Sequence, residues 1–231
     1  VIFAESFGKK LRTPCCAILC QSELAAALAL LSCFAAGVTA VPLSFRYGEA
    51  HCKRILRKIR PSAMITDVGG ELRVLHLDIA EKKQGTLEEW PAAILCTSGT
   101  TGEPKGVMLS EENFLTNIRD ICKYFKIEET DRILICRPLY HCAVLTGEFL
   151  VSLVKGLDIF FAPEKFDPVG ILKLLKQERI SVLCGTPSFF RLLCRFAGVN
   201  GCFALVKQIA VSGECMGNCL LYTSDAADDR I

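Results

Sequence analysis

Residues 93–109 read AILCTSGTTGEPKGVML. An apolar run typical of a buried strand is followed by four hydroxyl side chains, three glycines and one lysine. Glycine lets the backbone approach a ligand closely, and small hydroxyls add hydrogen-bond donors without bulk. Lysine adds a compact positive charge. This combination suits a chain of phosphates, so the stretch predicts a phosphate-binding loop between two extended segments.

Two common phosphate-binding motifs do not match this loop. The Walker motif requires Gly-Lys-Ser/Thr, whereas Glu103 and Pro104 separate Gly102 from Lys105, and no hydroxyl residue follows the lysine. The dinucleotide fingerprint Gly-x-Gly-x-x-Gly is also absent. The loop therefore belongs to a different class of nucleotide site.

The composition outside the loop is that of a globular protein with reduced thiols. In 231 residues, 51% are hydrophobic, which is ample for a buried core. The formal net charge of +2 indicates no whole-protein field that would attract nucleic acid or anionic lipid, and the basic segment 53–60 (KRILRKIR) is interpreted as a solvated helix face. The fourteen cysteines include no Cys-x-x-Cys pair, so we expect no metal site built from them. Most of the cysteines are expected to pack as small hydrophobic residues in the core of a cytoplasmic protein.

Strand-like and helix-like segments alternate along the chain. Strands are expected at residues 16–19, 38–41, 63–66, 73–77, 92–96, 133–136, 159–161, 182–184 and 206–211. Helices are expected at residues 23–36, 48–59, 111–125, 148–155, 168–178 and 188–196. Because the strands are apolar runs without strict alternation, they predict an α/β fold of layered, parallel-rich sheets with helices on both faces.

One apolar segment raises the question of a membrane span. Residues 24–41 (LAAALALLSCFAAGVTAV) reach about the minimum length that crosses a bilayer. Alanine dominates the segment, and Gly37 followed by a β-branched run indicates a helix stop and then a strand. We expect a buried helix and a strand here, and no membrane span.

Residues 97–107 resemble the phosphate-loop signature of the AMP-forming adenylating enzymes. This superfamily includes acyl-CoA synthetases, luciferases, aryl-acid ligases and the adenylation domains of peptide synthetases. Four further stretches are similar to family motifs in order and spacing: residues 30–43 with Arg46-Tyr47, Pro138-Leu139-Tyr140-His141, residues 184–187 (CGTP) and residues 208–214 (QIAVSGE). The resemblance covers about residues 13–216, so residues 1–218 are interpreted as part of the family's N-terminal domain.

The resemblance implies an activity and a set of site residues. Family members use MgATP to convert a carboxylic acid into an acyl adenylate with release of pyrophosphate, and then usually form a thioester with CoA or a carrier phosphopantetheine. The implied nucleotide-binding residues are Thr97, Ser98, Gly99, Thr100, Thr101, Gly102, Lys105, Gly213 and Glu214. Lys105 is the implied catalytic residue, which neutralises the leaving group, and His141 is the implied contact for the acid. No metal ligand is assigned, because Glu214 precedes the position of the family's magnesium-binding glutamate.

The kind of acid is inferred from a motif that is missing. Amino-acid-activating domains usually carry a Phe-Asp element near residues 138–141, and this chain has none there. A fatty, aryl or other amino-free acid is therefore favoured. There are two alternatives: an amino-acid adenylation domain of a peptide synthetase, and a non-catalytic nucleotide-binding relative.

The last residues are expected to be foreign to the protein. Residues 219–229 (CLLYTSDAADD) reverse-translate onto the mosaic-end adapter of transposase-made sequencing libraries, so residues 219–231 are interpreted as a read-through tail. The family's later motifs and its small C-terminal domain would lie beyond residue 218. We therefore expect the 231-residue chain by itself to be inactive.

Overall fold

The computed structural model describes residues 15–77, 91–97, 104–197, 203 and 206–215. They belong to two compact units, one formed by Val1–Asn117 and Pro138–Cys142, the other by Ile118–Arg137 and Ala143–Ile231. Each unit has its own sheet. Helix α4 (Glu111–Phe125) contains the boundary between Asn117 and Ile118.

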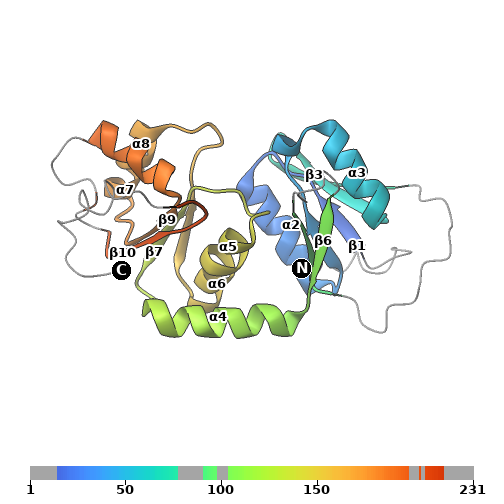
Figure 1. Cartoon of the computed structure of the whole chain (residues 1–231), viewed down its shortest axis with the longest axis horizontal. Helices are drawn as coiled ribbons and strands as arrows, with labels where there is room; N and C mark the ends of the chain where they lie inside the picture. The colour runs from blue at the N-terminus through green and yellow to red at the C-terminus, as the bar shows by residue number, and fades with distance from the viewer. Residues whose placement is uncertain (1–14, 78–90, 98–103, 198–202, 204–205, 216–231) are drawn as a thin grey trace. The chain divides into compact units, whose positions relative to one another are not determined.

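Unit 1 is built on a six-stranded sheet in the order β4-β3-β1-β2-β5-β6 (Figure 1). Its strands are β1 (Cys15–Ile18), β2 (Thr39–Pro42), β3 (Ala63–Val68), β4 (Glu71–His76), β5 (Ala93–Thr97) and β6 (Lys105–Leu109). Strand β1 pairs in parallel with β2 and β3, and β2 pairs in parallel with β5. The edge strands β4 and β6 are antiparallel to their neighbours. At β4 the reason is local, because Gly69 and Gly70 both have positive φ and reverse the chain in a tight turn.

Helices cover both faces of this sheet, as the sequence predicts. Helix α3 (Glu49–Ile59) packs Ile55 onto the face that carries Ala17 and Val41. Successive strand residues point to opposite faces, so Cys16 faces the other side. There the thiol of Cys33 in α2 (Glu23–Ala35) forms a hydrogen bond with the thiol of Cys16. This hydrogen bond, together with burial, raises the pKa of the Cys16 thiol.

Residues 24–41 contain most of helix α2 and of strand β2, as expected, but Leu24 and Leu28 are exposed, so the helix is only partly buried. The Ser22 hydroxyl accepts a hydrogen bond from the Ala25 amide at 3.4 Å and caps the helix. Glycine at 37, with φ +64°, then leads into β2. Among the described residues, no helix combines the length and the apolar character needed to cross a bilayer.

Unit 2 contains a parallel four-stranded sheet in the order β10-β9-β7-β8. The strands are β7 (Arg132–Ile135), β8 (Asp158–Phe161), β9 (Val182–Gly185) and β10 (Gln208–Val211). On one face, Leu134 and Leu183 pack with helices α7 (Pro168–Gln177) and α8 (Pro187–Ala197), which lie together beside β9 in Figure 1. On the other face, the ring of Phe149 lies 6.4 Å from that of Phe161.

The helix that contains Phe149 begins earlier than the sequence predicts. Three segments follow one another, α5 (Cys142–Val144), the π-helical turn η2 (Leu145–Leu150) and α6 (Val151–Lys155), whereas the expected start is residue 148. Val144, Leu145 and Thr146 are buried. Tertiary packing therefore makes residues 142–147 helical although Thr146 and Gly147 are poor helix formers.

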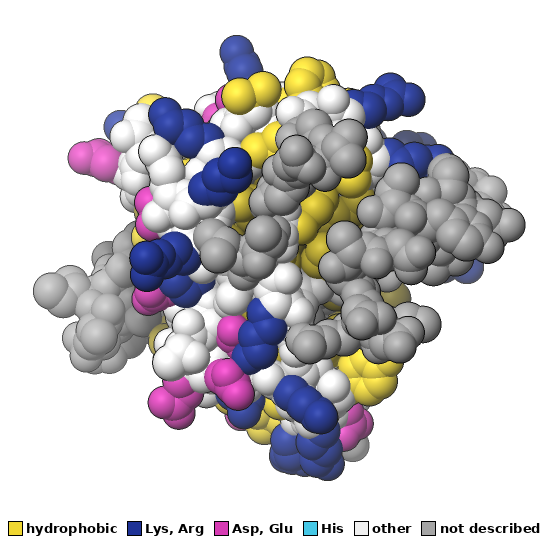
Figure 2. All heavy atoms as spheres, turned by 90° about the vertical axis from the view of Figure 1, so that its left-hand side faces the viewer, with side chains coloured by type: hydrophobic (Ala, Val, Ile, Leu, Met, Phe, Trp, Pro, Cys, Tyr) yellow, Lys and Arg dark blue, Asp and Glu magenta, His cyan; other side chains and the backbone are white. Residues whose placement is uncertain are grey.

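The expectation that the cysteines pack in the core is confirmed only in part. Among the described residues, twelve cysteines are free thiols: five of them (Cys15, Cys16, Cys33, Cys52 and Cys184) are buried, four are half-buried and three are exposed. The face drawn in Figure 2 carries Lys and Arg side chains interspersed with Asp and Glu. Mixed charges of this kind agree with the small net charge of the sequence.

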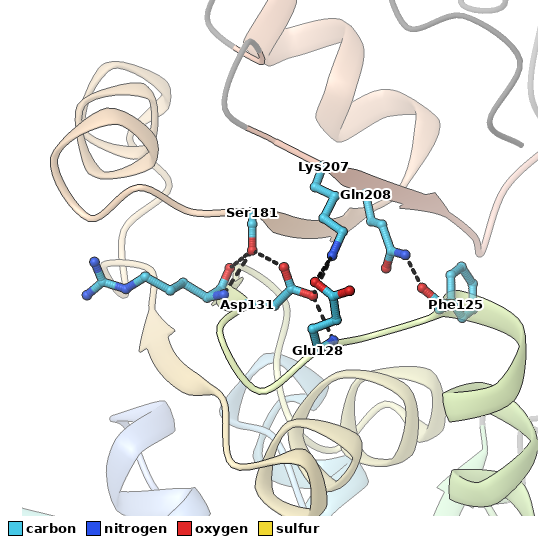
Figure 3. A network of polar contacts seen from close by, with 7 residues as sticks. Phe125, Glu128, Asp131, Ser181, Lys207 and Gln208 are labelled. Atoms are coloured by element: carbon cyan, nitrogen blue, oxygen red, sulfur yellow. Dashed lines mark hydrogen bonds and ion pairs between the residues drawn. The ribbon is translucent and has the colours of Figure 1, made fainter.

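A polar network fastens the amino ends of β7, β9 and β10 in unit 2 (Figure 3). The buried carboxylate of Asp131 accepts hydrogen bonds from the Ser181 hydroxyl at 2.8 Å and from the Glu128 amide at 2.9 Å. Lys207 donates to Glu128 at 2.7 Å and to Asp131 at 3.4 Å. Three segments distant in sequence therefore meet at one carboxylate.

Replacing Asp131 with asparagine is expected to lower the free energy of unfolding by about 2 kcal/mol, because an amide nitrogen takes the place of one accepting oxygen and leaves a buried donor unpaired. Urea denaturation would measure the change. The matched control is Asp120→Asn, since Asp120 is exposed and forms only an i,i+3 pair with Lys123. Equal stabilities of the two variants would show that the network is incidental.

Candidate functional site

The described part of the predicted phosphate loop is the base of a β-hairpin in unit 1. Thr97 is the last residue of β5, Lys105 is the first residue of β6, and the two residues face each other in the antiparallel register. Both are exposed. The intervening site residues Ser98, Gly99, Thr100, Thr101 and Gly102 lie outside the described residues. The structure thus brings one hydroxyl and the lysine together at the ends of the loop.

Two features of the structure position the start of β6, where Lys105 lies. Lys58 Nζ of α3 donates a hydrogen bond to the carbonyl oxygen of Pro104 at 2.8 Å. A Cβ on Gly106 would lie 2.9 Å from Ile94 Cγ2, so any other residue at this position would force Ile94 of β5 to shift. The interpretation of residues 53–60 as a solvated face therefore misses one function of Lys58, which positions the residue next to Lys105.

The predicted acid-contacting residue His141 belongs to an aromatic group in unit 1. The centroid of the Tyr140 ring lies 4.1 Å from the centroid of the His141 ring and 5.0 Å from that of the Tyr47 ring. Tyr47 follows the residues 30–43 motif, so two stretches that resemble family motifs meet here. The Leu139 amide donates to Glu23 Oε2 at 3.0 Å, which fixes the same loop to the first turn of α2. His141 itself is exposed.

The environment of Tyr47 is less polar than that of a surface tyrosine. Burial, followed by the neighbouring Tyr140, raises the pKa of Tyr47 to about 12. The shift strengthens the preference for the protonated hydroxyl, which is already the form of an ordinary tyrosine at neutral pH. Neither tyrosine is among the site residues assigned from the sequence, although both lie within stretches that resemble family motifs.

The predicted nucleotide residues Gly213 and Glu214 lie in unit 2, directly after β10. Gly213 has φ +93°, a conformation that favours glycine. The Glu214 carboxylate accepts hydrogen bonds from the Ser188 hydroxyl at 2.6 and 2.7 Å and from the Ser188 amide at 3.2 Å. These bonds lower the pKa of Glu214 and place a negative charge at the N-terminus of α8. This capping contact is not among the features predicted from the sequence.

The described residues offer no ready site for a magnesium ion. Among them, no group of three or more His, Cys, Asp or Glu side chains is arranged to hold a metal. The oxygens of Glu214 are engaged with Ser188. Mg²⁺ bound with a nucleotide is usually held by one or two carboxylates together with phosphates and water, and the described residues form no metal site of their own.

Comparisons with known proteins agree with the motifs and the fold. The profile of the family described as "AMP-binding enzyme" matches residues 9–221. Feruloyl-CoA synthase from Amycolatopsis sp. is 30% identical over 178 residues, which cover 70% of this chain and 36% of that protein. A hybrid PKS-NRPS synthetase from Fusarium sp. (strain FN080326) is 27% identical over 188 residues, 73% of this chain and 5% of that protein.

A solved structure shows the same fold. O-succinylbenzoate coenzyme A synthetase from Bacillus subtilis, in complex with AMP, superposes with a TM-score of 0.80 at 22% identity, over 98% of this chain and 62% of that chain. The present chain spans about a third of the length of the feruloyl-CoA synthase that it matches. Given the extent of the profile match and the shared fold, the chain belongs to the AMP-binding enzyme family.

Proposed function

We propose that the full-length protein activates a carboxylic acid with ATP, forms an acyl adenylate with release of pyrophosphate, and then transfers the acyl group to a thiol of CoA or of a carrier phosphopantetheine. The observation that carries this proposal is the hairpin of β5 and β6, which sets Lys105 opposite Thr97 at the two ends of the glycine-rich loop. Membership of the AMP-binding enzyme family supports it.

The chemistry explains why this loop needs a cation. A carboxylate oxygen attacks the α-phosphorus of ATP, a new O–P bond forms, and the bond to pyrophosphate breaks. Negative charge accumulates on the departing pyrophosphate. Lys105 and the hydroxyls and amides of residues 97–102 are proposed to bind the outer phosphates, where the ammonium neutralises that charge. Magnesium is proposed to accompany the ATP, and no ligand for it is assigned among the residues that the structure describes.

The acid is proposed to lack an amino group. The loop at residues 138–141 presents Tyr140 and His141, which form an aromatic group with Tyr47. An apolar or aromatic acid suits such a surface, whereas an ammonium group needs a carboxylate partner. His141 is proposed to contact this acid and is given no role as a base. Gly213 and Glu214 are proposed to line the nucleotide site.

Exchange of labelled pyrophosphate into ATP by the full-length protein tests this function. Fatty and aryl acids are expected to drive the exchange, while amino acids and a blank without acid do not. The 231-residue chain alone is expected to give no acid-dependent exchange. Exchange driven by amino acids would establish the adenylation-domain alternative, and no exchange with any acid would favour a non-catalytic nucleotide-binding protein.

A further inference from the structure

A buried ion pair lies at the carboxyl edge of the sheet in unit 2. Arg137 follows β7 by two residues, and its Nη2 donates to Glu148 Oε1 at 2.6 Å. The side chain of Glu148 is 2% exposed and that of Arg137 is 16% exposed. Glu148 is the single acid in the π-helical turn η2, whose neighbours Leu145 and Phe149 are buried apolar residues. A charge so placed needs a partner, and the guanidinium is that partner.

The backbone of Glu148 is also held, because the residue lies in the π-helical turn η2. Such turns are uncommon and occur often at functional sites. The Ser152 hydroxyl of α6 donates to the Glu148 carbonyl oxygen at 2.5 Å. Glu148 therefore has little freedom to move away from Arg137.

The second terminal nitrogen of the Arg137 guanidinium contacts the residues after β10. This Nη1 donates to the Ser212 hydroxyl at 3.2 Å, although β9 lies between β7 and β10 in the sheet. The turn at residues 212–214 also touches the end of β9, because the Ser212 amide donates to the Gly185 carbonyl at 3.0 Å. A Cβ on Gly213 would lie 3.6 Å from Thr186 Cγ2 and 4.0 Å from Arg137 Nη1. Arg137 thus bridges the carboxyl ends of two strands that are not neighbours.

The pair is poorly arranged for stability alone. Buried ion pairs add little net stability compared with apolar side chains of the same volume. Arg137 Nε and Glu148 Oε2 are buried and have no hydrogen-bond partner among the residues that the structure describes. The clear effect of the pair is geometric, since it holds one guanidinium in one orientation beneath the 212–214 turn.

We propose that Arg137 and Glu148 are a positioning pair for acyl-adenylate formation: the carboxylate orients the guanidinium, and the guanidinium holds the 212–214 turn in place. This inference rests on the proposed function, in which Gly213 and Glu214 line the nucleotide site. Open parallel sheets bind ligands outside the carboxyl ends of their strands, which is where the turn lies. A shift of about 1 Å in a turn that lines the nucleotide site is enough to lower the rate roughly 10²-fold.

The pair also predicts opposite effects of pH on activity and on stability. Burial raises the pKa of Glu148 to about 7, and Arg137 opposes this shift. The other titratable groups beside it are the thiols of Cys136 and Cys184, whose pKa values burial also raises, so neither ionises near neutral pH. As pH rises through about 7, Glu148 becomes charged and orients Arg137, so turnover rises. Stability falls earlier, between the ordinary pKa of 4.5 and about 7, and is level above that range, because between these pH values the folded state still binds the proton that the unfolded state has lost.

The test uses Glu148→Gln in the full-length protein. It is expected to lower kcat/KM for adenylation by about 10²-fold and to abolish the increase of activity around pH 7. Arg137→Lys should keep part of the activity, and Arg137→Met should not. The matched control is Asp131→Asn, which also neutralises a buried carboxylate but at the amino edge of the same sheet; it should lower stability and leave the pH profile unchanged. A Glu148→Gln protein with the wild-type kcat/KM and pH profile would overturn the proposal.

A second measurement on the wild-type protein keeps the test independent of variant folding. Amide hydrogen exchange at residues 212–214, corrected for the intrinsic effect of pH, should slow as pH rises through about 7. Protection that does not change would contradict a pair that holds the turn. This result stands even if the protein activates no acid, so failure of the pair and failure of the proposed function are distinguishable.

Discussion

Replacing Lys105 with alanine in the full-length protein is expected to lower the rate of acyl-adenylate formation by about 10²–10³-fold, which is the usual cost of removing one preorganised group that stabilises transition-state charge. The ammonium lies at the first residue of β6, opposite Thr97, where a hairpin fixes its backbone. Because charge moves onto pyrophosphate only as the reaction proceeds, kcat should fall more than KM for ATP rises. Single-turnover formation of the adenylate would measure the chemical step directly.

The matched control for this prediction is Lys53→Ala. Lys53 is also exposed and lies in the same unit, but its Nζ pairs with Glu49 one helical turn away at 2.5 Å. An exposed pair of this kind contributes little, so activity should stay close to that of the wild type. Lys105→Arg should recover part of the lost rate, since it keeps the charge and changes the shape. If Lys105→Ala and Lys53→Ala behave alike, the loop does not bind the outer phosphates and the proposed function fails with it.

The parts of the candidate site that are contiguous in sequence could be predicted, and those that depend on packing could not. The eleven-residue motif at residues 97–107 identifies Thr97 and Lys105 without any structure. The bond from Lys58 to Pro104 joins residues 46 positions apart, and its donor is one of several basic residues on α3. Only packing selects Lys58 among them. Glu148 did leave a signal, since it is the one acid in the apolar residues 143–154.

The fold was predictable to a similar degree and for similar reasons. Alternation of apolar runs and helices indicated a parallel-rich α/β fold, and both sheets confirm it. The direction of the edge strands was missed, because alternation along the chain does not specify pairing. Gly69-Gly70 is the signal in the sequence for the β3–β4 hairpin. In the second hairpin, formed by β5 and β6, Thr97 and Lys105 are the paired ends. The early start of the helix at Cys142 depends on burial of Val144 and Leu145, which no local pattern reveals.

Leu134→Ala is expected to lower the free energy of unfolding by about 3 kcal/mol, the largest effect on stability among these predictions. Leu134 is the β7 residue that meets both helices on one face of the unit 2 sheet, where it is fully buried among Ile171, Leu175 and Phe190. Truncation removes apolar surface from the centre of this cluster and leaves a cavity, because residues on strands and helices around it cannot all move inward together. Urea denaturation at fixed pH would measure the loss.

The matched control is Leu153→Ala in α6, which removes the same atoms from a side chain that is 39% exposed. That change should cost well under half as much, because much less apolar surface is withdrawn from its neighbours and alanine is the better helix former. Equal losses would show that the cluster around Leu134 is not the centre of the unit 2 core. Unequal losses in the expected order tie the stability of β7 to its packing, and β7 is the strand that leads into Arg137 and the loop at residues 138–141. The cavity should therefore also quicken amide exchange at the carboxyl end of β7 while leaving the hairpin of β5 and β6, in the other unit, protected as in the wild type.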